Sequence, residues 1–313
     1  MKKILFFILC LFCFSVNAQE LLLDNEIIRF KKIEDYNLQG FTLTDKYIVA
    51  FLINEDNNKA IIKAFDINDY HEVNSIKTNS LGHANDATYN KNTNLIYVIR
   101  NGNNLINMFD ADTLEYRGEV YTELPIRSLA YIPDIDMYAA RVVTSGYYLN
   151  NDFTVNSSIP FVIGLNIEFD TCRQGWTYYN DHIYYSKWSW IRKGGDGTNH
   201  ISIYDLNGTQ VDELVTRGDI GELEDVDFIN DKMILGINRY DNYVTFYLED
   251  IPLIDPLFRG AQEIEIIEEE IEEEEIKETN HELFQKILLA LVFIVYIVFL
   301  FYSLKVRIKK RLI

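Results

Sequence analysis

A unit of roughly 40–50 residues recurs five times between residues 21 and 257, and this repeat constrains the fold more than any other feature. Each copy contains an apolar run that follows a turn; the runs are DKYIVAFL, NLIYVIR, DMYAARVV, DHIYYSKW and DKMILGIN. Counted from Tyr47 through Tyr97, Tyr138 and Tyr184 to Ile234, they are spaced by 50, 41, 46 and 50 residues. A second marker, a strand ending in an aromatic residue, is spaced by 44, 44, 51 and 43 residues from Phe65 through Phe109, Phe153 and Tyr204 to Tyr247. Two independent markers with five copies each are typical of a β-propeller.

The composition between these markers is also that of an all-β fold. Short runs rich in Tyr, Ile, Phe and Val alternate with clusters of Asn, Asp and Gly, without a long helical pattern. We therefore predict a five-bladed β-propeller in residues 19–257, with blades at residues 39–79, 81–122, 124–164, 165–218 and 221–251. The spare strand at residues 21–33 is expected to complete the last blade and close the ring, which removes open sheet edges. A β-sandwich is the alternative, but it does not explain a repeated four-strand unit.

Both ends of the chain predict export and membrane anchoring. Residues 1–18 have the layout of a secretory signal peptide, with two lysines, an apolar stretch and the small-residue site Val16-Asn17-Ala18. Residues 284–304 contain an apolar run long enough to span a bilayer, and the basic tail at 305–313 predicts a cytoplasmic C-terminus. The glutamate-rich residues 258–283 are expected to form an acidic stalk. Together these segments predict a single-pass cell-membrane protein with its N-terminal domain outside the cell.

The charge, the cysteine content and the absence of known metal motifs limit which partners, disulfides and cofactors the predicted domain can have. The chain has a net charge of −19, and residues 19–262 alone hold 37 acidic and 20 basic residues. Such a surface disfavours nucleic acids, whose phosphates attract basic proteins. Only Cys172 remains after removal of the signal peptide, so no internal disulfide is expected. Because no HExxH, CxxC or complete calcium-binding loop is present, the sequence predicts neither a metal site nor a cofactor.

Polar residues gather in the segment that leads into each apolar run. In a propeller the innermost strand of each blade lines the central channel, so these segments are expected to meet at one mouth of it. The segments are NLQGFTLTD, LGHANDATY, ELPIRSLAY, TCRQGWTYY and GELEDVDF. From them we predict a ligand-binding set of His83, Asn85, Asp86, Arg127, Arg173, Gln174, Trp176, Glu224 and Asp225. Trp176, which opens the aromatic stretch 176–190, is the ring that we expect to be exposed.

Three of these segments resemble the blade motifs of secreted bacterial propellers of the helveticin-like and teichoic-acid-associated kind. The motifs are Gly82-His83-Ala84-Asn85-Asp86, Gln174-Gly175-Trp176 and Gly221-Glu222-Leu223-Glu224. The resemblance covers these motifs and nothing of the stalk or the apolar span. It implies a surface-displayed binding domain or wall-associated domain, and it implies no catalytic residue.

Three functions fit such a domain. The first is binding of an extracellular carbohydrate or protein ligand at the channel mouth, with arginines and acids as hydrogen-bond and charge partners. The second is glycoside hydrolysis, which needs two carboxylates across the scissile bond; Asp86 with Glu224 or Asp225 is the candidate pair. The third is a scaffold that uses the side faces of the propeller. We favour ligand binding, because the remaining segments carry Gln39, Arg127 and Arg173 in place of acids.

Overall fold

The computed structural model describes residues 18–33, 35–54, 59–79, 81–100, 102–143, 145–160, 171–189, 197–216 and 220–254, with the backbone alone at 171–173. The predicted signal peptide (except Ala18), the acidic stalk, the apolar span at 284–304 and the basic tail lie outside these residues. In the part of the chain that the structure describes, no helix is long and apolar enough to cross a membrane.

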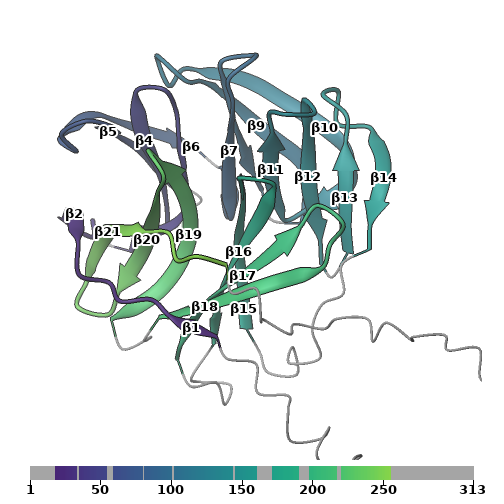
Figure 1. Cartoon of the computed structure of the whole chain (residues 1–313). Helices are drawn as coiled ribbons and strands as arrows, with labels where there is room; N and C mark the ends of the chain where they lie inside the picture. The colour runs from purple at the N-terminus through teal and green to yellow at the C-terminus, as the bar shows by residue number, and fades with distance from the viewer. Residues whose placement is uncertain are drawn as a thin grey trace, which may run out of the picture. The chain divides into compact units, whose positions relative to one another are not determined.

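Five separate sheets surround a central axis (Figure 1). The first is β3 (Asn37–Leu43), β4 (Tyr47–Asn54), β5 (Lys59–Asp66) and β6 (Glu72–Asn79). The second is β7 (Asp86–Asn90), β8 (Leu95–Ile99), β9 (Asn103–Asp110) and β10 (Tyr116–Ile126), and the third is β11 (Ser128–Ile132), β12 (Met137–Val142), β13 (Ser145–Leu149) and β14 (Val155–Ile159). The fourth contains β15 (Thr171–Tyr179), β16 (His182–Ser189), β17 (Asn199–Asp205) and β18 (Gln210–Thr216), and the fifth contains β19 (Gly221–Ile229), β20 (Lys232–Arg239) and β21 (Tyr243–Asp250). This arrangement confirms the predicted five-bladed β-propeller and excludes the β-sandwich.

The first strands of the five blades contact one another in a closed ring. Strand β3 meets β7, β7 meets β11, β11 meets β15, β15 meets β19, and β19 meets β3. The ring is narrow, because β7 also contacts β15 across the axis. Each predicted segment therefore contains part of an innermost strand, but the match is incomplete. The prediction began the third blade at residue 124, whereas residues up to Ile126 belong to β10, the outermost strand of the second blade. We call the end of the channel where these strands begin the strand-start mouth, and the end where they finish the strand-end mouth.

The N-terminal segment closes the ring, as predicted. Strand β2 (Glu26–Lys31) is the outermost strand of the fifth blade, where it pairs antiparallel with β21. The two-residue strand β1 (Gln19–Glu20) pairs in parallel with β18 in the fourth blade, an addition that the sequence did not predict. Figure 1 shows both purple strands beside green strands from the later part of the chain. The N-terminal segment of the domain therefore contributes one strand to each of the last two blades.

Apolar clusters lie between neighbouring blades, one at each of the five junctions. Between blades two and three, Tyr138 is completely buried and its ring lies 4.8 Å from that of Phe153 and 5.6 Å from that of Tyr97. These residues are among the aromatic markers of the sequence repeat. The repeat is therefore visible in the sequence because each blade must present apolar side chains to both of its neighbours. Burial of these side chains is the main term that stabilises the ring.

Candidate functional site

The channel is lined by two layers of equivalent positions, one residue from each innermost strand in each layer. The first layer, which we call the strand-end ring, consists of Thr42, Thr88, Ala130, Thr177 and Asp227. Thr88, Thr177 and Asp227 lie opposite the repeat markers Tyr97, Tyr184 and Ile234. Interblade hydrogen bonds add Ala130 and Thr42, because the residue after each of them donates its N–H to Thr88 and to Asp227, respectively. The second layer lies two residues earlier, and we call it the strand-start ring: Gly40, Asp86, Ser128, Gly175 and Asp225. Residues two apart on a strand share a face, so both rings face the axis.

Asp86 belongs to the strand-start ring and is completely buried. Its Oδ1 accepts a hydrogen bond from the Ala87 N–H at 2.8 Å, and its Oδ2 accepts from Leu129 at 2.7 Å and from Trp176 at 3.1 Å. The three donors come from three different blades. Burial raises the pKa of Asp86 to about 7, although the backbone donors and the charge of Arg141 oppose this rise. The carboxylate of Asp86 thus joins three blades at the axis.

Asp225 lies in the same ring and is also buried. Its Oδ1 accepts from the Val226 N–H at 2.8 Å, and its Oδ2 accepts from the Phe41 N–H of the first blade at 3.3 Å. The carboxylate lies against Gly175 of the fourth blade. Burial and the nearby charge of Asp86 raise the pKa of Asp225 well above its usual value. Asp86 and Asp225 therefore form an electrostatically linked pair inside the ring.

Three innermost strands carry a β-bulge at the same level, just before the strand-start ring. The bulges take Gln39, Gln174 and Glu224 out of the regular pairing, and all three side chains are buried. The amide of Gln174 donates to Glu222 at 3.0 Å, and Glu224 accepts a hydrogen bond from the side chain of Asn238. Bulges often re-aim a side chain. Here the bond from Gln174 to Glu222 connects blades four and five, whereas Glu224 and Asn238 both belong to blade five.

Most of the predicted ligand-binding residues face protein. Six of them are buried: Asn85, Asp86, Gln174, Trp176, Glu224 and Asp225. The expectation that Trp176 is exposed is wrong, because only 3% of it is accessible. Its ring lies 5.9 Å from that of Tyr185, within the apolar cluster between blades three and four. The side chain of Arg173 lies outside the described residues.

His83 and Arg127 are half-buried at the strand-start mouth. His83 lies in the turn before β7, between Gly82 and Ala84, whose φ angles are 65° and 44°. A left-handed conformation costs a non-glycine residue roughly 1–2 kcal/mol, and such strain is concentrated at functional sites. The amide of Asn85 donates to the backbone oxygen of Arg127 at 3.2 Å and links the two segments. Ligand contact by His83 and Arg127 stays a prediction.

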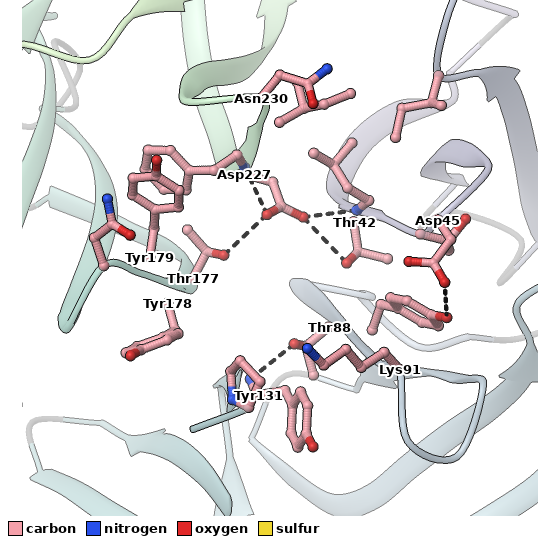
Figure 2. Close-up of a pocket in the computed structure, with 18 of the residues that line it drawn as sticks. Thr42, Asp45, Thr88, Lys91, Tyr131, Thr177, Tyr178, Tyr179, Asp227 and Asn230 are labelled. Carbon is pink, nitrogen blue, oxygen red and sulfur yellow. Dashed lines mark hydrogen bonds between the residues drawn. The ribbon is translucent and has the colours of Figure 1, made fainter. Parts of the chain in front are cut away.

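A cavity of about 610 Å³ opens at the other end of the channel, the strand-end mouth (Figure 2). The strand-end ring forms its floor through Thr42, Thr88, Thr177 and Asp227. The walls include the aromatic residues that follow the ring positions and the turns between the first and second strands; the aromatic residues are Tyr89, Tyr131, Tyr178, Tyr179 and Phe228. This volume is in the range of small-molecule sites. None of the nine predicted residues is among the described residues that line it, so Asp86 and Glu224 do not face this space.

Asp227 is the one ionisable member of the strand-end ring. Its Oδ2 accepts from the Leu43 N–H at 2.8 Å and its Oδ1 accepts from the Phe228 N–H at 2.8 Å. The hydroxyls of its two ring neighbours, Thr42 and Thr177, donate to it over longer distances of 3.4 and 3.3 Å. Figure 2 shows this group at the centre of the floor. Removal of the carboxylate from bulk water raises the pKa of Asp227 to about 6.

Pairs of tyrosine and aspartate surround the cavity. The hydroxyl of Tyr178 donates to Asp134 at 2.6 Å and to Asp181 at 3.2 Å, and the hydroxyl of Tyr89 donates to Asp45 at 3.4 Å. These hydrogen bonds hold the aspartate side chains in position at the cavity mouth. The cavity therefore combines aromatic walls with a negative rim.

The sequence held a signal for this cavity that the prediction did not use. Comparison of the ends of the five segments, rather than their beginnings, finds an aromatic residue after the ring position in four blades. The residues are Tyr89, Tyr131, Tyr178 and Phe228. What the sequence does not reveal is which end of the channel is open.

Among the described residues, no group of three or more His, Cys, Asp or Glu side chains is placed to hold a metal ion.

No protein-family model matches the chain, and no curated protein sequence matches it. Among solved structures, the chain is similar to the glutaminyl cyclase of Myxococcus xanthus, with a TM-score of 0.52 and 9% identity over 75% of this chain and 100% of that one. It is also similar to a member of the duf4221 family from Bacteroides vulgatus, with a TM-score of 0.43 and 10% identity over 75% of this chain and 98% of that one. The WD40 repeats of RRP9 give a TM-score of 0.38 and 12% identity over 69% and 62% of the two chains. At 9% identity, the similarity to the glutaminyl cyclase is a similarity of fold alone. The fold of this chain is a five-bladed β-propeller.

Proposed function

We propose that the protein is an exported, single-pass membrane protein whose propeller binds an extracellular carbohydrate or protein ligand in the cavity at the strand-end mouth. The leading apolar segment, the apolar run at 284–304 and the basic tail support the predicted location. The acidic stalk would hold the propeller away from the bilayer. The proposed topology places the cavity in contact with the extracellular medium.

The observation that carries the proposal is the open cavity on the axis of a closed ring. Aromatic walls and a few polar groups that converge on one floor are the usual composition of a ligand site. The floor side chains Thr42, Thr88 and Thr177 come from three different blades, so ring closure positions them rigidly. The fully hydrogen-bonded Asp86 and the buried Glu224 are not on this cavity, and no observation favours the hydrolase alternative.

Six of the nine residues predicted from the sequence take a supporting role in this proposal. Asp86 and Asp225 join blades directly behind the strand-end ring, and Gln174 and Glu224 brace the same region. They would keep the cavity floor in place rather than contact the ligand. His83 and Arg127 lie at the opposite, strand-start mouth and would not contact a ligand in this cavity. Ligand contact by these two residues stays a separate prediction.

Binding is tested with the full-length protein, purified in detergent, on an array of polysaccharides and on an array of surface proteins. Two variants, Lys91→Trp and Asp134→Trp, place an indole at the cavity mouth on exposed positions. We expect the wild type to bind at least one array member and both variants to bind it about tenfold more weakly, because the ring would block the opening. Binding by both variants at wild-type strength would place the site elsewhere. No binding to either array would contradict the proposed function.

Location is tested by adding a protease to intact cells that produce the full-length chain with an epitope after residue 313. We expect the propeller to be degraded from outside, leaving a short tagged fragment that contains residues 284–313. A propeller that is digested only after the cells are broken open would refute the proposed topology. This result is independent of whether a ligand is found.

A further inference from the structure

Asp227 carries a charge that its structural role does not require. In the strand-end ring, Asp227 accepts the backbone N–H of Leu43 from the next blade at 2.8 Å. The equivalent Thr88 does the same with its hydroxyl, which accepts from the Tyr131 N–H at 3.0 Å. A neutral threonine is therefore sufficient for the interblade bond. Yet the fifth blade places a carboxylate there, where loss of hydration makes ionisation unfavourable.

The surroundings of Asp227 suit a positively charged group. Its two backbone bonds are short, whereas the bonds from the Thr42 and Thr177 hydroxyls are long and rotatable. An incoming ammonium group can take the place of these two hydroxyl donors, and the turned hydroxyls can then accept its remaining protons. A hydrogen bond between a cation and a carboxylate is stronger than a neutral one. The floor thus offers a carboxylate and two hydroxyls to one small cation.

The walls suit the chain that would carry such a cation. Tyr89, Tyr131, Tyr178 and Phe228 line the path between the rim and the floor. Aromatic rings attract ammonium groups through their faces and pack against the methylene groups of an aliphatic stem. Among the described lining residues, acids outnumber bases four to one: Asp45, Asp134, Asp181 and Asp227 against Lys91. A negatively charged ligand would be repelled from this space.

The side chain of Lys91 shows how an ammonium group on an aliphatic chain can lie in this cavity. It extends from the turn between β7 and β8, it lines the cavity, and Figure 2 shows its side chain directed toward Thr88 on the floor. Lys91 is exposed, and it adds a positive charge to an otherwise acidic cavity. The Lys91 ammonium group would therefore compete with a cationic ligand for the negative potential of the cavity.

From these observations we propose that the cavity binds a primary ammonium group on an aliphatic chain, as in a lysine side chain of a protein ligand, with Asp227 as its anchor. This inference rests on the proposed function. Of the two ligand classes proposed there, it favours a protein that presents a cationic side chain over a neutral carbohydrate. The cavity walls take the aliphatic stem, and Asp227 with Thr42 and Thr177 takes the ammonium group.

The test uses the full-length protein and two matched probes, Nα-acetyl-lysine methylamide and its Nε-acetylated form, which has the same stem without the charge. Affinity is measured by NMR titration of the probe. We expect the charged probe to bind at least about tenfold more tightly than the capped one, since a charge-assisted hydrogen bond contributes this much. Equal binding of both probes, or binding of neither, would overturn the inference.

Variants assign the interaction to Asp227. Asp227→Thr introduces the residue type that the ring already uses, so the acceptor for Leu43 is kept while the charge is removed; it should lose about tenfold in affinity for the charged probe. Lys91→Met, at an exposed position, removes the competing charge and should strengthen binding about threefold. Glu123→Gln, on exposed β10, removes one negative charge outside the cavity and should change affinity less than twofold. Unchanged binding in Asp227→Thr or weaker binding in Lys91→Met would contradict the assignment.

Failure of the inference can be distinguished from failure of the proposed function. If the charged probe does not bind but an array polysaccharide does, and Lys91→Trp blocks it, the cavity is a neutral carbohydrate site and only the inference is refuted. If neither the probes nor any array member binds, both are refuted.

Discussion

The carboxylate of Asp225 occupies the space that a side chain on Gly175 would need: a Cβ atom on Gly175 would lie 2.0 Å from Oδ1 of Asp225. The two residues belong to neighbouring blades, four and five, and both lie in the strand-start ring. Gly175 has no positive φ, so the restriction is steric and not conformational. A glycine in one blade thus makes room for the carboxylate of the next.

This fit predicts a strong coupling between the two positions. Gly175→Ala should lower the free energy of unfolding by about 3 kcal/mol, because the carboxylate must leave its backbone donors to make room. In an Asp225→Ala background the same substitution should cost at least about 1 kcal/mol less. Urea unfolding of the four proteins, followed by tryptophan fluorescence, measures the cycle. Additive effects would mean that the two residues do not share this space.

The raised pKa values of the buried acids predict how stability depends on pH. Asp86, with a pKa of about 7, and Asp225, with a pKa raised well above its usual value, hold protons more tightly in the folded than in the unfolded protein. Stability should therefore fall as the pH rises from about 4 through 7, by an amount on the order of 2–4 kcal/mol. Asp86→Asn removes one of the acids and the charge that raises the pKa of Asp225, so the slope should be flatter. The readout is the melting temperature between pH 4.5 and 8; parallel curves for wild type and variant would contradict it.

The junction between the last and first blades depends on the side-chain amide of Asn238. It donates to the backbone oxygen of Leu38 at 2.7 Å and accepts from the Leu38 N–H at 3.0 Å, and it also donates to Glu224. Asn238→Asp turns a donor into a carboxylate that faces two oxygens. We expect a loss of about 2–4 kcal/mol in unfolding free energy. Asn207→Asp, at an exposed turn position, serves as the control and should change stability by less than about 0.5 kcal/mol. Similar losses in both variants would contradict the role of Asn238.

The closing strand predicts that the N-terminal segment is needed for stability. Ile28 on β2 is 5% exposed and packs in the cluster between blades five and one. Ile28→Ala should cost about 2–4 kcal/mol, as for other buried aliphatic side chains. Val73→Ala, on the outer strand β6 with 40% exposure, should cost less than about 0.5 kcal/mol. If the two variants melt at the same temperature, β2 does not close the ring in solution.

Because Asp227 has a pKa of about 6, we expect the binding of an amine to depend on pH. The lysine probe remains charged below pH 9, so its affinity should rise as Asp227 loses its proton, with a midpoint near pH 6. Asp225 lies behind the floor, and Lys91 and the rim acids Asp45, Asp134 and Asp181 line the cavity. Because Asp227→Thr removes the anchoring carboxylate, this variant should lose most of the rise. A pH profile that survives in Asp227→Thr would assign the titration to another group, Asp225 first.

Much of the architecture follows from local pattern. The markers that repeat every 40–50 residues, such as Tyr97, Tyr138 and Phe109, are interblade core residues, and their period directly reports the blade count. The spare strand before the first copy implied closure by β2, because an unpaired edge is unfavourable. The segments expected to line the channel each contain part of an innermost strand, but the third was begun too early, because residues 123–126 continue the outer strand β10. The brief parallel pairing of β1 was not predicted, since two residues carry no periodic signal.

The sequence by itself therefore determined the number of blades, the closing strand and the approximate position of each innermost strand, because strand alternation and repeat spacing are local properties of the chain. Only the tertiary structure decided which polar groups meet solvent. The narrow ring buries Asp86 and Asp225, and the packing of blade three on blade four buries Trp176, while the strand-end mouth stays open over Asp227. Burial of a polar side chain depends on neighbours that ring closure brings from distant parts of the chain, and no short segment encodes that distance.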